Sequence, residues 1–283
     1  MSADRIALLG AIAGFTIYFG LPVGRVASLG QRSRSFLSVV SAGILLFIFW
    51  DVLSAAHEML DGSLSAARGG GSWSPFVARA LVMVAGFAVG ALGLARLERA
   101  LLRRRPPVPM AGGSDLAVAG GAPSTTDLLA EARRASLTLG MLIAVAIGLH
   151  NFSEGLAIGV SARTGAIGLA TTLIVGFALH NATEGFGIVG PLGDVRPSWG
   201  WLLVAGLVGG GPTFVGTLVG ERVTSPTLEI SFYAMAAGAI LFVIGQIWPT
   251  AQRRLSADWV MTGIVIGFLV ALGSDLVISY AGG

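Results

Sequence analysis

Two short strings, HNFSEG at 150–155 and HNATEG at 180–185, place histidine, asparagine and glutamate inside otherwise apolar segments. On an α-helix, positions i and i+4 lie about 40° apart and position i+1 lies about 100° round, so each string gathers its polar side chains in one patch. A carboxylate in hydrocarbon costs about 2.5–3.5 kcal/mol, which a bound divalent cation would offset. The sequence therefore predicts a metal site with these ligands: His150, Asn151, Glu154, His180, Asn181 and Glu184.

The side chains of the two strings limit the choice of metal. The chain has no cysteine, which excludes thiolate ligands and structural disulfides. Imidazole, carboxylate and amide oxygen suit Zn²⁺, Mn²⁺, Fe²⁺, Co²⁺ or Ni²⁺, which affinity alone separates poorly. Ser153 and Thr183 directly precede the two glutamates, where a hydroxyl bonds to a carbonyl of the preceding turn or holds a water molecule. We expect these two residues to support the ligands.

Three further polar residues lie in apolar segments and are accessory candidates. Asp51 is either part of the entrance for the ion or an acidic residue near water at the outer mouth. Gln246 is expected to form a hydrogen bond between helices rather than to bind metal, and Asp275 either relays protons or metal or ties the bundle together. Thr213 follows the run GGGP at 209–212 and is expected to mark a kink rather than a ligand.

The composition identifies the elements that must position these side chains as transmembrane helices. Hydrophobic residues make up 54% of the 283 residues and charged residues only 12%, against about 25% in soluble domains. Apolar runs of roughly 20 residues recur between short charged segments, which is typical of spanning helices. The 42 glycines indicate close helix packing. We predict an all-α protein with eight spans, at roughly 5–23, 37–56, 76–97, 138–161, 166–190, 198–220, 230–250 and 257–280.

The distribution of arginine predicts how the chain lies in the membrane. Alternate loops collect 13 of the 18 basic residues, so the positive-inside rule makes these loops cytoplasmic and places both termini outside the cytoplasm. Topology also accounts for the basic pI of about 10.1, and nucleic-acid binding is not expected. The predicted organisation is three spans in 1–97, a flexible cytoplasmic loop at 98–137, the metal-binding pair of spans in 138–190 and three spans in 191–283.

Repetition of the string on consecutive spans predicts an internal symmetry. The spans at 138–161 and 166–190 must run antiparallel because the turn between them is short. Two copies of one motif on antiparallel neighbours imply a local pseudo-twofold axis in the membrane plane, an arrangement that places transport sites near the middle of the bilayer. The structural alternative is that these histidines and glutamates only pair across helices and hold them together. Such a role would not require the same string twice.

At these residues the sequence resembles the ZIP family of metal-ion transporters, and most closely its bacterial and archaeal branch. The resemblance implies eight spans, a central fourth and fifth span between inverted repeats, and metal binding through the six ligands given above. Ser153 and Thr183 stand where many members have proline, which implies softer kinks. Some members have further carboxylates or histidine in the sixth and seventh spans, where this chain has Thr213, Gln246 and Ile247. Because these additional ligands are missing, one bound metal is expected rather than two.

The function expected from the site and the resemblance is alternating-access transport of divalent transition-metal ions, Zn²⁺ first, across the inner membrane toward the cytoplasm. No P-loop is present, so transport should follow gradients rather than ATP hydrolysis. The alternatives are an intramembrane metalloenzyme with the same ligands, although the zinc-protease signature HExxH is absent, and a metal-sensing receptor. We expect no enzymatic activity and no cofactor besides the transported ion. The oligomeric state stays open, a homodimer included.

Overall fold

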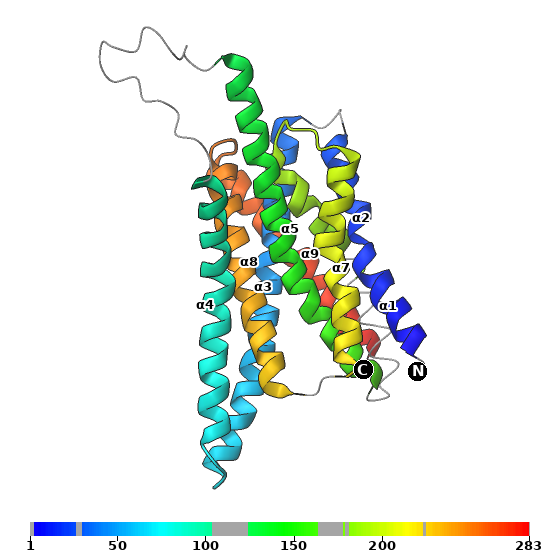
Figure 1. The fold of residues 1–283 in the computed structure, drawn as a ribbon, viewed down its shortest axis with the longest axis vertical. Coiled ribbons are helices and arrows are strands. Elements are labelled where there is room, and N and C mark those ends of the chain that lie inside the picture. The colour runs from blue at the N-terminus through cyan, green and yellow to red at the C-terminus, as the bar shows by residue number, and fades with distance from the viewer. Residues whose placement is uncertain are drawn as a thin grey trace, which may run out of the picture.

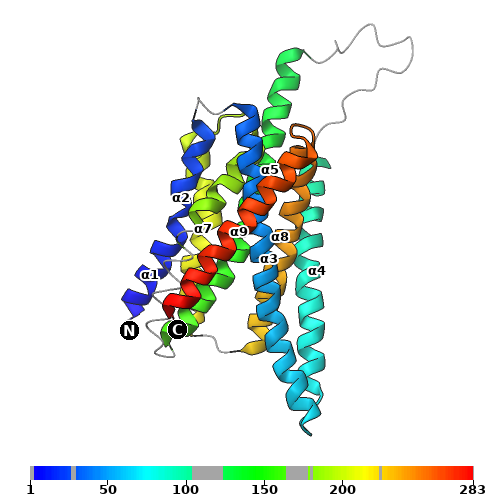
Figure 2. The ribbon, with the colours of Figure 1, turned by 180° about the vertical axis from the view of Figure 1, so that it is seen from behind.

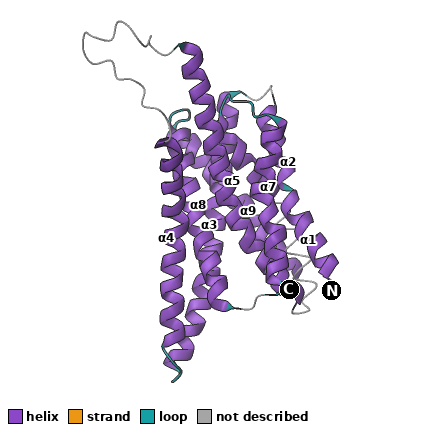
Figure 3. Cartoon of the chain, in the orientation of Figure 1, coloured by secondary structure: helices purple, strands orange, loops and turns teal. Residues whose placement is uncertain are grey.

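In the computed structural model the described residues are 3–26, 30–103, 124–163, 178, 181–222 and 225–282, and this part of the chain is helical, with turns between the helices and no strand (Figure 3). The elements are α1 (Ala3–Phe15), α2 (Ile17–Gly20), η1 (Leu21–Arg25), α3 (Gln31–Arg68), α4 (Ser74–Arg103), α5 (Thr125–Arg163), a helix over 181–189, η2 (Gly190–Leu192), α7 (Trp199–Gly220), α8 (Pro226–Gln252) and α9 (Ala257–Gly282).

Seven helical segments of the described part are long and apolar enough to cross a membrane, and they correspond to seven of the eight predicted spans. The protein is thus an all-α membrane protein, as predicted. Of the predicted fifth span, 166–190, only residue 178 and residues 181–190 are described, so the eighth crossing stays a prediction. The seven segments are Asp4–Arg25, Gln31–Arg68, Ser74–Ala100, Thr125–Val160, Trp199–Gly220, Pro226–Gln252 and Ala257–Leu276.

Several helices continue well beyond the apolar runs that mark them in the sequence. α5 has 39 residues, or about 58 Å of helix, against a hydrocarbon core of about 30 Å. Its first turns project beyond the other helices in Figure 1. Residues 98–103 and 125–137 of the predicted loop are consequently helical, and residues 104–123 lie outside the described part. Hydropathy detects only the lipid-buried part of a helix. Turns with charged side chains keep the same backbone hydrogen bonds and so remain helical, although their hydropathy is low.

Both termini lie at one end of the bundle, which we call the terminus end (Figure 2). The opposite end, which we call the arginine end, contains the connection over 190–198 and three arginines that donate to backbone carbonyls. Arg34 donates to Gly193 at 2.9 Å, Arg133 donates to Arg196 at 3.0 Å, and Arg25 donates to Pro197. Guanidinium groups thus stabilise the connections at this end by satisfying carbonyls that no helix ladder uses.

The helix contacts follow an inverted repeat. The first predicted span packs on the sixth as α1 on α7, and the second packs on the eighth as α3 on α9. The third packs on the seventh as α4 on α8. In an inverted repeat the second span corresponds to the seventh and the third to the eighth, so the contact of α4 with α8 is equivalent to the contact of α9 with α3. α5, the fourth span, packs most extensively on α7. Its expected counterpart, the helix over 181–189, contacts the first span through Gly185.

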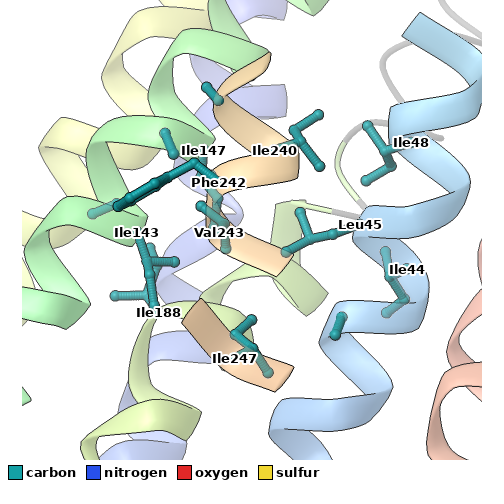
Figure 4. Packing of buried hydrophobic residues seen from close by; sticks show 14 of the residues in the cluster. Ile44, Leu45, Ile48, Ile143, Ile147, Ile188, Ile240, Phe242, Val243 and Ile247 are labelled. Atoms are coloured by element: carbon teal, nitrogen blue, oxygen red, sulfur yellow. The ribbon is translucent and has the colours of Figure 1, made fainter. Parts of the chain in front are cut away.

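An apolar cluster packs inside the bundle, as Figure 4 shows. It includes residues of α3, α5, α8 and the helix over 181–189, and the branched side chains that it buries are at most 5% exposed. Ile147 lies one turn before His150 on α5, and Ile188 lies one turn after Glu184 on its helix. The labelled members are Ile44, Leu45, Ile48, Ile143, Ile147, Ile188, Ile240, Phe242, Val243 and Ile247.

Candidate metal centre

One imidazole and two carboxylates meet inside the bundle. The Nε2 atom of His150 lies 3.0 Å from Oε1 of Glu154 and 3.7 Å from Oε1 of Glu184. The three residues are only 2%, 5% and 2% exposed. His150 and Glu154 come from one face of α5, whereas Glu184 comes from the helix over 181–189, so the site joins the two strings that the sequence predicted to face each other.

The separations between these atoms match those between ligands of one small cation. Zinc binds nitrogen and oxygen at about 2.0–2.2 Å, so two tetrahedral ligands lie about 3.3 Å apart. The two observed distances bracket this value. Among the described residues, no group of three or more His, Asp and Glu side chains is arranged to hold a metal ion as it stands, and His150 contacts Glu154 directly. A divalent ion would take the place of this contact. His180, the second predicted imidazole ligand, lies outside the described residues.

The two asparagines of the strings occupy equivalent positions in the repeat. Nδ2 of Asn151 donates to the carbonyl of Gly209 on α7 at 3.0 Å, and Nδ2 of Asn181 donates to the carbonyl of Ala13 on α1 at 3.0 Å. Both residues are 0% exposed, and neither Oδ1 atom has a hydrogen-bond partner among the described residues. Each amide is therefore fixed by its nitrogen while its oxygen stays available as a ligand.

Both carbonyls that accept from the asparagines lie where a helix is irregular. The first span breaks at Thr16, between α1 and α2, and the Thr16 hydroxyl also donates to Ala13 at 2.6 Å. α7 contains Pro212, which has no N–H to donate to the carbonyl of Val208, the residue directly before Gly209. Irregular helices of this kind present backbone carbonyls to neighbouring side chains. The GGGP run that the sequence marked as a kink thus contributes the anchor of Asn151.

The glycine that ends each string permits a backbone-to-backbone approach. A Cβ on Gly155 would lie 2.1 Å from the carbonyl oxygen of Thr213, and one on Gly185 would lie 2.6 Å from that of Ile17. Both distances are far below an ordinary contact, so only glycine fits at either position without a shift of the helices. These glycines hold α5 against α7 and the helix over 181–189 against the first span, which brings each asparagine to its carbonyl.

The remaining predicted site residues differ in their surroundings. The hydroxyl of Ser153 donates back to Leu149 at 3.4 Å, the bond expected from the sequence, while Thr183 is half-buried. Asp51 is exposed on α3, and Asp275 is half-buried on α9. Thr213 is fully buried, with its hydroxyl directed against α1 beside Gly14.

Gln246 lies apart from the metal ligands. Its Nε2 atom donates to Oε2 of Glu98 on α4 at 3.0 Å, near the arginine end of the bundle. This is the helix-to-helix hydrogen bond that the sequence favoured over a ligand role. Both Gln246 and Glu98 are half-buried, and their hydrogen bond holds α8 against α4.

Sequence reasoning missed Glu229 and Tyr233, both on α8. Tyr233 interacts electrostatically with three carboxylates, those of Glu229, Asp51 and Glu154. Glu229 lies one turn before Tyr233 on the same helix, and in the first turn of α8, where an acidic residue is ordinary at a helix start, nothing in its local sequence indicated a further role.

Comparison with known proteins agrees with this geometry. A family model described as ZIP Zinc transporter matches residues 123–245, which include both strings. A zinc transporter ZupT of Corynebacterium glutamicum is 28% identical over 269 residues, covering 91% of this chain and 95% of the relative. A zinc transporter ZupT of Corynebacterium aurimucosum is 29% identical over 265 residues, covering 88% and 89%. The paired strings and the similarity along nearly the whole chain make this chain similar to zinc transporters of the ZIP family.

Proposed function

We propose that the protein transports a divalent transition-metal ion, Zn²⁺ first, across the cell membrane toward the cytoplasm. The observation that carries the proposal is the buried meeting of His150, Glu154 and Glu184 from two helices. Two buried carboxylates carry more negative charge than the single imidazole between them can balance, and a divalent cation compensates the excess. The two relatives are named zinc transporters, which favours Zn²⁺ over Mn²⁺, Fe²⁺, Co²⁺ and Ni²⁺.

The proposed ligand set is the one predicted from the two strings. His150 binds through nitrogen, Glu154 and Glu184 bind through carboxylate oxygen, and His180 adds a second neutral imidazole. Asn151 and Asn181 add amide oxygens, which is supported by nitrogens already committed to backbone carbonyls. The hydrogen bonds to Gly209 and Ala13 orient these ligands, as the outer partners of metal ligands do. One ion is proposed, since Gln246 lies apart and Thr213 is directed against α1.

We propose that the ion enters from the terminus end. Asp51 is exposed on α3 and Glu229 lies in the first turn of α8, and acidic side chains of this kind attract cations. Because arginine-rich connections gather at the opposite end, the positive-inside rule makes the terminus end extracytoplasmic. Entry from this end is uptake.

Release toward the arginine end requires the apolar cluster to open. Ile147 and Ile188 follow the ligands toward that end, and both are nearly fully buried. Glycine contacts join α5 to α7 and the helix over 181–189 to the first span, so these helices form one unit. α3, α4, α8 and α9 form the other, and the apolar cluster lies between them. Movement of one unit against the other around the site is alternating access.

Zinc uptake by proteoliposomes tests this proposal. Glu154→Gln and Glu184→Gln each remove one anionic ligand while keeping the size of the side chain, and each should lower zinc affinity by at least tenfold. Glu131→Gln is the matched control, since Glu131 is exposed near the start of the same helix as Glu154. Uptake by the control should equal that of the wild type. Failure of the wild type to move any of the five ions, or equal uptake by all four proteins, would disprove the proposed site.

A further inference from the structure

A cavity of about 660 Å³ opens at the arginine end, away from the metal ligands. The first turns of α3 form one wall, with Arg32 and Ser33. The connection from α8 to α9 forms the other, with Arg254 and Ser256. α3 and α9 pack side by side and both begin at this end. The cavity volume lies within the range of about 300–1,000 Å³ that is usual for ligand sites.

The polar half of this cavity suits a phosphate. Two guanidinium groups and two hydroxyls line it, and none of its lining residues is acidic. Arginine binds phosphate through paired N–H donors, and hydroxyls add further donors. The first turn of α3 and the first turn of α9 contribute positive helix ends in the same place.

The two arginines of the cavity differ from the three arginines that stabilise the connections at this end. Arg25, Arg34 and Arg133 donate to backbone carbonyls and so stabilise connections. The side chains of Arg32 and Arg254 form no hydrogen bond or ion pair with the rest of the described chain, and both are exposed.

The position of Arg254 is itself fixed by the fold. Its guanidinium lies against Gly193, which has a φ of +61°. A Cβ there would lie 2.8 Å from Nη1 of Arg254, so glycine both permits the backbone turn and leaves room for the guanidinium. The charge is thereby held at the rim of the cavity.

The other half of the cavity is apolar and faces lipid. Phe36 and Trp259 meet edge to face with their ring centres 5.6 Å apart, and Leu37 and Leu255 extend the wall. Trp259 is 59% exposed and lies in the first turn of α9. Tryptophan at this depth is typical of the boundary between headgroups and acyl chains. The ligand of such a cavity must therefore be both anionic and apolar.

We infer that this cavity binds an anionic phospholipid of the leaflet at the arginine end, with its phosphate between Arg32 and Arg254 and an acyl chain along Trp259 and Phe36. Positive-inside topology makes this the inner leaflet. Basic pockets between transmembrane helices on that side recognise anionic headgroups. The absence of acidic residues from the lining disfavours a zwitterionic headgroup, whose cationic amine would need a partner.

Lipid binding is best measured on the full chain in nanodiscs by native mass spectrometry, with phosphatidylglycerol competing against phosphatidylcholine. Wild type should retain phosphatidylglycerol preferentially. Each arginine near an anionic surface contributes about 1 kcal/mol, so the double variant Arg32→Gln/Arg254→Gln should bind phosphatidylglycerol about 30-fold more weakly, or about 2 kcal/mol at about 1.4 kcal/mol per tenfold. Each single variant should lose about fivefold.

The matched control is Arg96→Gln/Arg99→Gln, which removes two exposed arginines of α4 at the same end but outside the cavity. It should keep the wild-type preference. Equal retention of both lipids by wild type, or equal losses in the two double variants, would overturn the inference. If glycerol phosphate bound to the wild type as tightly as phosphatidylglycerol does, the assignment to a lipid would be overturned, because the apolar half of the cavity would then be dispensable.

A second measurement does not depend on the arginine variants. Brominated phosphatidylglycerol should quench wild-type tryptophan fluorescence more than brominated phosphatidylcholine does, and Trp259→Phe should abolish the difference. A difference that survives in Trp259→Phe would overturn the inference.

Discussion

Replacing Gly155 by alanine tests the helix contact on which the metal site depends. The added Cβ would lie 2.1 Å from the carbonyl oxygen of Thr213 and 2.8 Å from the backbone nitrogen of Thr217. It is thus about 1.3 Å short of an ordinary contact of 3.4 Å, and backbone atoms cannot turn aside. Overpacking of this kind costs about 1–3 kcal/mol, against about 1 kcal/mol gained whenever alanine replaces glycine within a helix.

The control is Gly93→Ala on α4, where a Cβ would meet no described atom within 4 Å. This variant should therefore show only the gain in stability that alanine gives over glycine within a helix. We expect Gly155→Ala to be less stable than Gly93→Ala by about 1–3 kcal/mol in thermal unfolding in detergent. Metal sites tolerate shifts of only about 0.2 Å, so displacement of the neighbouring Glu154 should also weaken zinc binding at least tenfold by calorimetry. Equal stability and equal affinity in the two variants would refute the reasoning.

Four further substitutions separate ligand, gate and structural roles. Asn151→Ala and Asn181→Ala should each weaken zinc binding about 10–100-fold by calorimetry, because each removes an oriented amide, and a loss confined to one of them would contradict their equivalence. Ile147→Ala removes a buried gate side chain and should raise the passive leak of Zn²⁺ from loaded proteoliposomes; an unchanged leak would exclude the cluster as the barrier. Gln246→Leu breaks the bond to Glu98 but no metal contact, so uptake should stay within about twofold, and loss of uptake would place Gln246 on the ion path.

Much of the fold is predictable from the sequence because hydropathy responds directly to the solvent. Apolar runs marked seven crossings that the structure contains, and the repeated string indicated that two spans face each other. The ends of the helices were not predictable in the same way. Helix α5 continues through charged turns into water, where neither hydropathy nor charge separates helix from loop.

The candidate site was predictable as far as it lies within the strings. His150, Glu154 and Glu184 meet because their spacing places them on facing helices. The anchors of the asparagines were not predictable, since the carbonyls of Gly209 and Ala13 carry no sequence signal and depend on irregularities in other helices. Glu229 was missed because an acidic residue in the first turn of a helix is ordinary and indicates no further role.

Anomalous diffraction from crystals of the zinc-loaded protein tests the proposed metal centre most directly. The proposal predicts one anomalous peak at the zinc edge, about 2.0–2.2 Å from Nε2 of His150 and from one carboxylate oxygen each of Glu154 and Glu184. The peak should vanish in crystals of Glu154→Gln/Glu184→Gln and persist in those of Glu131→Gln. A peak that lies outside the two strings, or one that persists after loss of both carboxylates, would contradict the central claim.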